Sequence, residues 1–219
     1  MSFQLVNSNA VVAARQFNPS VLSQLWLVDN QIVAREEFAD GGVFTEMIVQ
    51  VNAAPFAILV TPDQLQFVPR VDPVAQQAII TERLGALIRA LPHTPYTAVG
   101  LNFTWHKSSE ERAEFGRISR RLFYREGSSL FREFQADDAR FGGYLSKDCL
   151  GLRMKLDIKP MTTHTENIAN ELMQFAFNFH LDVFNREDRA ESIVVALANW
   201  DAAREEATRI MDRIQEDLA

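Results

Sequence analysis

Two stretches of this chain alternate between apolar and polar residues. Residues 96–106 and 173–184 each carry a large apolar side chain at nearly every second position, and the second stretch includes Phe175, Phe177 and Phe179. A period of two places alternate side chains on opposite faces of a β-strand, whereas a helix would spread these phenylalanines around its circumference. Both stretches are therefore predicted strands with one buried face and one polar face.

The first half of the chain is predicted to contain two helices separated by strands. Asn18-Pro19 and Asp72-Pro73 each combine an N-cap residue with a proline at the first helical position. The first helix is expected to be short, and the second carries a long apolar stripe that ends at Pro92. Asp40-Gly41-Gly42 is typical of a turn between strands. The predicted strands of this half are residues 3–17, 32–39, 44–51, 56–61 and 65–69.

The second half is predicted to follow a similar order. Ser108-Ser109-Glu110-Glu111 has the form of a capping box and predicts a helix that continues to about Tyr124. A hairpin is expected around Leu150-Gly151, and Asp188 is expected to open a single helix that continues to the C-terminus. The predicted strands are residues 96–106, 141–149, 152–159 and 173–184, with a polar loop at residues 161–170.

Both halves thus follow the order β-α-β-β-β-α, with one extra strand possible in the first. We predict an α+β fold in which two similar units form a largely antiparallel sheet with helices packed on one face. The units would be residues 1–92 and 93–219, the product of an internal duplication, or they would merge into one integrated domain. In element order alone the chain resembles the duplicated saddle of TATA-binding-like folds and the helix-grip fold, and this resemblance carries no function.

Cysteine content and hydropathy indicate a compartment. Cys149 is the only cysteine, so no disulfide can form within the chain. No stretch approaches the roughly 20 apolar residues that a membrane helix needs. The first residues also lack the basic head and apolar core of a signal peptide. We therefore expect a cytoplasmic protein that is not bound to a membrane.

The net charge of −7 is unevenly distributed. Residues 1–106 carry −3 and residues 161–219 carry −7, whereas residues 107–160 carry +3. Arginines in this middle segment could bind an anionic partner, because a guanidinium matches a phosphate or carboxylate. Glutamates share the same predicted helix, however, and no aromatic RNA-binding motif is present. Nucleic acid is thus a disfavoured partner, and an ion-pair surface is the simpler interpretation.

Recognisable catalytic motifs are absent from the sequence. There is no glycine-rich phosphate loop, no Gly-x-Ser-x-Gly elbow and no His-Glu-x-x-His zinc motif, and we expect no cofactor. Polar residues on the two best predicted strands form the strongest candidate ligand-binding set. These residues are Asn102, Thr104, His106, Asn178, His180 and Asp182.

If the two strands are neighbours, these six side chains could converge. His106, His180 and Asp182 would then offer a general acid/base pair or a metal-binding set. The simpler interpretation is an ordinary solvent-facing sheet face, which antiparallel sheets commonly have.

Four classes of function remain open. The favoured one is an interaction or assembly protein that forms a homodimer and binds another protein. An alternative is a small-molecule binder with a cavity between a curved sheet and the last helix, and with Asn178, His180 and Asp182 at its mouth. A hydrolase or metal-dependent enzyme using His106, His180 and Asp182 is less favoured, and a nucleic-acid binder is the least favoured. The apolar stripe of the last helix fits either a seam with a partner helix or packing on its own sheet.

Overall fold

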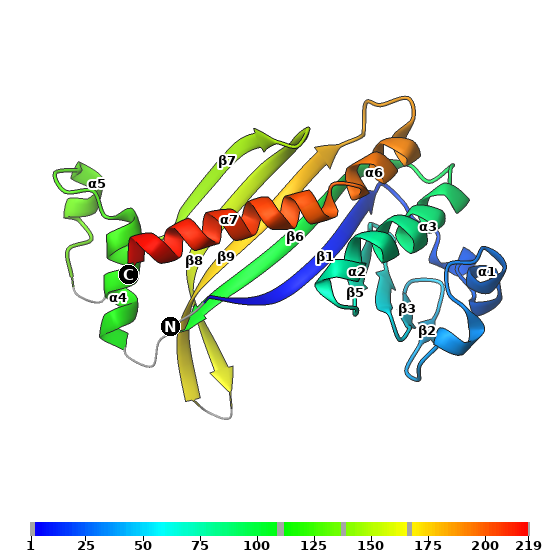
Figure 1. Cartoon of the computed structure of the whole chain (residues 1–219), viewed down its shortest axis with the longest axis horizontal. Helices are drawn as coiled ribbons and strands as arrows, with labels where there is room; N and C mark the ends of the chain where they lie inside the picture. Colours follow the sequence, from blue (N-terminus) through cyan, green and yellow to red (C-terminus); the bar gives the residue numbers. More distant parts are fainter. Residues whose placement is uncertain (1–2, 109–111, 137–138, 166–167, 219) are drawn as a thin grey trace.

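The computed structural model describes residues 3–108, 112–136, 139–165 and 168–218, and it contains one nine-stranded antiparallel sheet (Figure 1). The strand order is β2-β3-β4-β5-β1-β6-β9-β8-β7. The strands are β1 Gln4–Ala14, β2 Val43–Phe44, β3 Val49–Asn52, β4 Phe56–Val60, β5 Gln64–Pro69, β6 Tyr96–Ser108, β7 Gly143–Cys149, β8 Leu152–Thr165 and β9 Ile168–Asp182.

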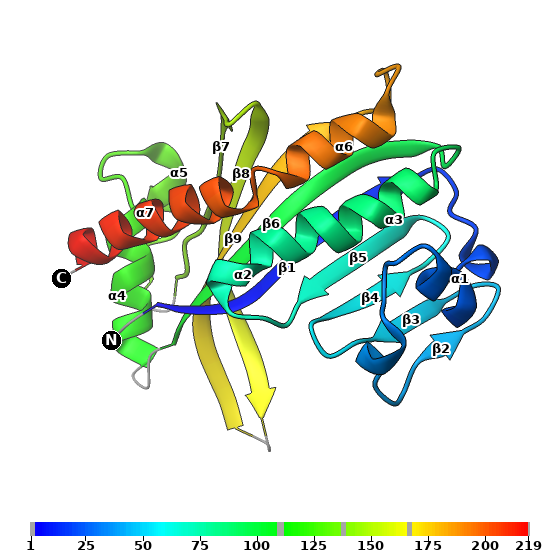
Figure 2. The same cartoon turned by 45° about the vertical axis from the view of Figure 1, so that its right-hand side comes forward.

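Helices α2, α3, α6 and α7 lie over one face of this sheet in both views (Figures 1 and 2). No helix of the described residues lies over the other face of its central strands, and we call this the open face. The helical segments are η1 Pro19–Val21, α1 Gln24–Asp29, η2 Arg35–Glu37, α2 Pro73–Ile79, η3 Ile80–Leu84, α3 Gly85–Ala90, α4 Arg112–Phe123, α5 Ser129–Arg132, α6 Arg189–Leu197 and α7 Trp200–Leu218. The predicted α+β class with an antiparallel sheet is confirmed. Among the described residues, no helix is long and apolar enough to cross a membrane.

The two halves of the chain meet in the middle of the sheet. Strands β1 to β5 form one side and β6 to β9 the other, and β1 pairs antiparallel with β6 at the junction. The strand order is mirrored there, because each half places its first strand at the junction and its last strand directly beside it. The predicted boundary at residues 92–93 falls between α3 and β6, and the sheet continues across it.

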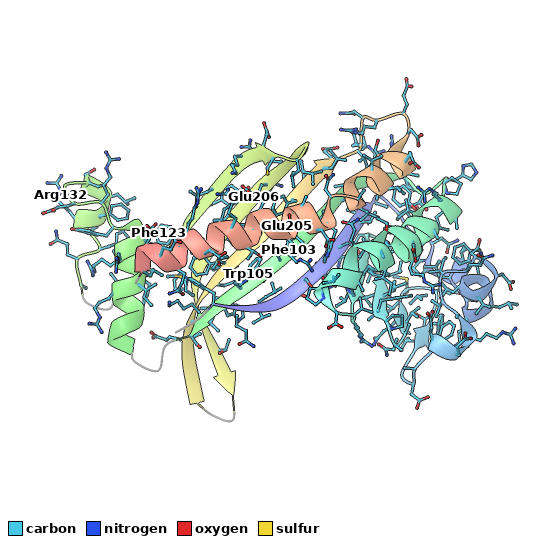
Figure 3. All side chains as sticks on the ribbon, in the orientation of Figure 1. Phe103, Trp105, Phe123, Arg132, Glu205 and Glu206 are labelled. Atoms are coloured by element: carbon cyan, nitrogen blue, oxygen red, sulfur yellow. The ribbon has the colours of Figure 1, made fainter. Side chains whose placement is uncertain are left out.

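The helix-covered face of the sheet forms the core. Phe103, Phe177 and Phe179 are fully buried there, as the alternation of their strands predicted. Trp200 of α7 lies against this layer, with its ring centroid 4.7 Å from that of Phe103, and its Nε1 donates a hydrogen bond of 3.2 Å to Gln76 Oε1. Figure 3 shows Phe103 and Trp105 in the region covered by α7. The apolar stripe of the last helix therefore packs mainly on its own sheet.

The predicted single C-terminal helix is wrong, since α6 and α7 are separate segments. The side chain of Gln77 in α2 bridges the break. Its Nε2 donates to Leu197 O at 3.3 Å, and its Oε1 accepts from Asp201 N at 3.0 Å. One distant amide thus satisfies a carbonyl at the end of α6 and an N–H at the start of α7, which would otherwise lack partners at helix ends. The helix from Asp72-Pro73 forms as predicted, with a π-helical turn at η3.

Three other predictions in the first half need correction. Residues 32–39 contain the 3₁₀ turn η2 instead of a strand, because Glu37 Oε2 accepts a hydrogen bond of 2.8 Å from Ala34 N. Residues 44–51 are interrupted by a turn in which Thr45 Oγ1 accepts from Ile48 N at 3.0 Å. The helix expected after Asn18-Pro19 is only the short turn η1, and α1 begins after its own N-cap, Ser23.

The polar loop predicted at residues 161–170 is also wrong. Strands β8 and β9 continue through it as a two-stranded ribbon, from the Pro160–Met173 pair to the Thr165–Ile168 pair. Both views show this ribbon projecting beyond the rest of the sheet (Figures 1 and 2). Residues 161–170 are mostly polar and carry no run of alternating apolar residues, so the sequence gives no strand signal there. Most of the predicted capping box at Ser108-Ser109-Glu110-Glu111 lies outside the described residues.

Candidate functional site on the open face

A row of asparagines crosses the centre of the open face. Asn102 of β6 pairs in register with Asn9 of β1 on one side and with Asn178 of β9 on the other. Lys155 of β8 pairs in turn with Asn178. Residues in register across a sheet point to the same face, so four polar side chains from four strands lie side by side. We call Asn9, Asn102 and Asn178 the amide row.

The amide row is hydrogen-bonded in one direction. Asn178 Nδ2 donates to Asn102 Oδ1 at 2.6 Å, and Asn102 Nδ2 donates to Asn9 Oδ1 at 2.8 Å. The two ends of the row keep unused capacity: within the described residues, neither Asn9 Nδ2 nor Asn178 Oδ1 has a hydrogen-bond partner. Asn9 is only 6% exposed. Both unpaired atoms are accessible to solvent, so a ligand or water can use this remaining capacity.

Gly100 makes room for this arrangement. A Cβ atom at this position would lie 2.5 Å from Asn178 Nδ2 and 3.7 Å from Asn102 Oδ1. Glycine is unfavourable in the middle of a strand, and it commonly marks a close approach by another group. Here the approaching group is the Asn178 amide itself. Gly100 therefore lowers the stability of the strand but leaves the space that the Asn178 amide occupies.

The amide row lies in a shallow trough of about 460 Å³. Five carboxamide side chains line it together with one threonine hydroxyl, one tyrosine and two charged groups. They are Asn7, Asn9, Gln66, Asn102, Asn178, Thr104, Tyr144, Lys155 and Asp157, beside Val11, Ala176 and Phe177. Asp157 is paired with Lys159 at 3.3 Å, while Lys155 has no ion pair among the described residues. The trough is thus rich in uncharged donors and acceptors and contains one uncompensated positive charge.

His180 lies next to the trough, on the register row of Gly100 and Arg153. Partial burial lowers the pKa of its imidazole, the positive charge of Lys155 lowers it further, and Asp182 opposes the shift. Burial disfavours the charged form of histidine and a neighbouring cation does the same. His180 is therefore mainly neutral at pH 7, with one ring nitrogen able to donate a hydrogen bond and the other able to accept one.

The structure brings together only some of the six candidate residues. Asn102, Thr104 and Asn178 line the trough, and His180 and Asp182 follow on β9 beyond it. His106 lies elsewhere: it pairs with Gln174, six residues before His180, which corresponds to roughly 20 Å along the strand.

The expected convergence of His106, His180 and Asp182 is therefore not observed. Among the residues that the structure describes, no group of three or more His, Cys, Asp or Glu side chains could hold a metal ion.

The side chains of Asn178 and His180 lie on the open face and cannot reach the space between the sheet and the last helix. Asn178 and His180 lie between buried residues of β9 that face the helices, so their own side chains point away from α6 and α7. They cannot stand at the mouth of a cavity between the sheet and the last helix. The phenylalanines of the core and Trp200 pack together in that space.

Sequence reasoning missed most of the residues that line the trough, among them Asn9 and Lys155, and it also missed the role of Gly100. Asn9 and Lys155 belong to strands that were predicted, but their place beside Asn178 depends on strand order, which no local pattern reveals. Gly100 did carry a signal, because an isolated glycine inside an alternating strand indicates a close approach. Comparisons with protein-family models, with curated proteins and with solved structures find no match to this chain.

Proposed function

We propose that this chain is a non-enzymatic interaction or assembly protein of the cytoplasm, which binds a protein partner through the open face of its sheet. The observation that carries the proposal is the trough around the amide row. It gathers side chains from strands β1, β5, β6, β7, β8 and β9 into one surface that offers hydrogen bonds and is covered by no other part of the described chain.

The chemistry of the trough supports a peptide segment as the bound group. A carboxamide has the same donors and acceptor as a peptide group, so a partner's main chain can pair with asparagine and glutamine side chains. Lys155 adds a single charge that suits a carboxylate on the partner. Hydrogen bonds that replace water contribute little affinity individually but select strongly against a partner that leaves them unmade.

The scaffold forms part of the same proposal. We infer that the two units, residues 1–92 and 93–219, arose by internal duplication, and the mirrored strand order about the β1–β6 junction supports this. We further propose that the protein acts as a homodimer. A single cysteine, Cys149, is consistent with a reducing compartment, where thiols stay reduced.

A small polar molecule is the second candidate for the same trough. Its volume of about 460 Å³ lies within the range of roughly 300–1,000 Å³ that is common for small-molecule sites. Such sites usually have only a small number of polar groups among apolar and aromatic side chains, whereas five of the twelve residues that line this one are carboxamides and two more are charged. A protein segment is therefore the better match.

The proposal is tested by photo-crosslinking in the native host. A benzoyl-phenylalanine at Tyr144, which lines the trough, should give a discrete adduct with a partner protein. The matched control places the same group at Val74 of α2, which is 89% exposed and distant from the open face. The adduct should weaken when Asn102→Ala or Lys155→Ala is added.

Equal adducts from both positions would contradict the proposal, as would a folded Tyr144 variant that gives none. An adduct with the mass of two copies of the chain would show that Tyr144 contacts a second copy, and it would support the homodimer but not a different protein in the trough.

A further inference from the structure

Strand β7 ends the sheet and leaves one edge without a partner. All seven of its residues pair with β8, from Gly143–Ile158 to Cys149–Leu152, with no shift in register. Within the described residues, no backbone hydrogen bond joins β7 to any strand other than β8. The edge therefore presents a regular set of free N–H and C=O groups, which is a template for another strand.

This edge lacks the usual protection. Natural edge strands are kept apart by shortness, by proline, by a bulge, or by charged side chains at the edge. The opposite edge of the sheet follows this rule, since β2 is only the two residues Val43–Phe44. Strand β7 has no proline and no bulge, and it has two charged residues, Lys147 and Asp148. Asp148 is paired with Arg153 of the neighbouring strand β8 at 3.1 Å.

The one lysine of β7 is held against the helix layer. Lys147 Nζ donates to Glu206 Oε1 of α7 at 2.9 Å. Hydrogen bonds from Arg209 and Lys147 lower the pKa of Glu206 to about 2, so the carboxylate stays ionised at neutral pH. This lysine therefore offers the edge less protection than a lysine free to project over it.

Two large side chains on β7 are exposed on opposite faces of the sheet. Tyr144 is 63% exposed and pairs with Asp157 on the open face, whereas Leu145 is 52% exposed and pairs with the buried Leu156 on the helix side. A strand added at the edge would cover both side chains at once.

We propose that β7 is a homodimer interface, in which the β7 strands of two copies pair antiparallel with Leu145 opposite Leu145 of the second copy. The inference rests on the homodimer part of the proposed function, and it shares Tyr144 with the trough but does not depend on which partner the trough binds. Within the chain, β1 and β6 already join two half-sheets by antiparallel pairing. The β7 contact would join two copies in the same way into one continuous sheet.

The register follows from the side chains that would face each other. With Leu145 on the two-fold axis, Tyr144 faces Ser146 of the second copy and Lys147 faces Gly143. Centring the pair on Ser146 would instead place Leu145 opposite Lys147, and centring it on Lys147 would place two like charges opposite each other, which is destabilising. Centring it on Tyr144 would place the two Tyr144 side chains opposite each other and Leu145 opposite Gly143. Only the first register places Leu145 opposite another large apolar side chain without opposing like charges.

Cysteine cross-linking tests this register directly. In a Cys149→Ser background the chain has no thiol, so one cysteine can be placed at will. Under mild oxidation Leu145→Cys should form a covalent dimer, because directly opposed residues of antiparallel strands have Cα atoms about 4.5–5.5 Å apart, within disulfide range. Ser146→Cys is the register control and Val74→Cys, on the exposed side of α2, is the background control. We expect Leu145→Cys to cross-link at least ten times faster than either.

Faster cross-linking of Ser146→Cys would overturn the register, and cross-linking of Leu145→Cys no faster than Val74→Cys would overturn β7 as the interface. Light scattering of the unmodified chain separates the failures. A monomer at every concentration would refute the homodimer itself, whereas a dimer without cross-links would refute only the β7 contact.

A seven-residue edge buries less than the roughly 800 Å² per partner of a standard interface. The expected dimer is therefore concentration-dependent.

Discussion

The two faces of this sheet are built by the same strands but from opposite chemistry. On β6, Phe103 is fully buried under the helices, while its neighbour Asn102 is hydrogen-bonded on the open face. On β9, Phe177 and Phe179 flank Asn178 in the same way. One face consists of interlocked aromatic rings, and the other consists of amides with unused hydrogen-bonding capacity.

The contrast between the faces separates stability from binding. Burial of a large apolar side chain stabilises the fold by about 1.5–3 kcal/mol, whereas a single exposed polar side chain contributes little. Substitutions on the helix-covered face should therefore unfold the protein. Substitutions on the open face should leave it folded and change what it binds. The predictions below test this division.

The largest effect is expected for Trp200→Ala. Trp200 is fully buried, packs against Phe103 and donates a hydrogen bond to Gln76. Its loss should lower the free energy of unfolding by about 3–5 kcal/mol, because it leaves a cavity and an unpaired amide oxygen. Urea unfolding followed by circular dichroism measures this change. Val74→Ala, at an exposed helix position, should stay within about 0.5 kcal/mol of the unsubstituted chain. A loss below about 1 kcal/mol for Trp200→Ala would contradict a core centred on this residue.

The division between the faces was predictable from sequence, because the period of two assigned each side chain of β6 and β9 to a face. The phenylalanines Phe175, Phe177 and Phe179 are buried as expected. The same reasoning placed Asn102 and Asn178 on one polar face, and the structure shows them hydrogen-bonded. Whether they bind a ligand stays a prediction.

Features that depend on distant partners were not predictable. His106 and His180 share a face but differ by six positions in register, which alternation cannot reveal. The break between α6 and α7 is bridged by Gln77, more than a hundred residues earlier in the chain. Residues 161–170 carry no alternation to detect, although β8 and β9 stay paired up to Thr165 and Ile168. Each of these failures arises where a tertiary contact, instead of local pattern, determines the structure.

The next largest effect is expected at Gly100, where the absence of a side chain makes room for the Asn178 amide. Gly100→Ala places a methyl group against the Asn178 amide and should cost about 1–3 kcal/mol of unfolding free energy. In an Asn178→Ala background the same substitution should cost much less, because the clashing group is gone. A double-mutant cycle by urea unfolding should therefore give a coupling energy of about 0.5–3 kcal/mol. Additive effects would mean that the glycine has no role in positioning Asn178.

A smaller effect on stability is expected for Asn102→Ala. Asn102 makes both hydrogen bonds of the amide row, so its loss should lower the free energy of unfolding by about 0.5–1.5 kcal/mol. The matched control is Gln174→Ala. Gln174 lies on the open face like Asn102, but on β9, and its side chain makes no hydrogen bond among the described residues. It should change stability by less than about 0.5 kcal/mol. Equal losses for the two variants would show that the amide row does not act as a unit.

The smallest effect concerns the charge state of the open face. Because burial and Lys155 lower the pKa of His180, the unfolded chain takes up this proton at a higher pH than the folded chain. The contribution to stability is complete above about pH 6.5, the usual pKa of histidine, and decreases as the pH falls below it.

Proton NMR of the His180 ring should show a titration midpoint below about 6.5, and Lys155→Met should raise this midpoint. Lys159→Met should move the midpoint less, because Lys159 is paired with Asp157. A His180 pKa that does not respond to Lys155 would mean that this lysine points away from the trough. In that case the trough would have no cationic group to attract a partner's carboxylate, and only the neutral amides would distinguish it from an ordinary wet sheet face.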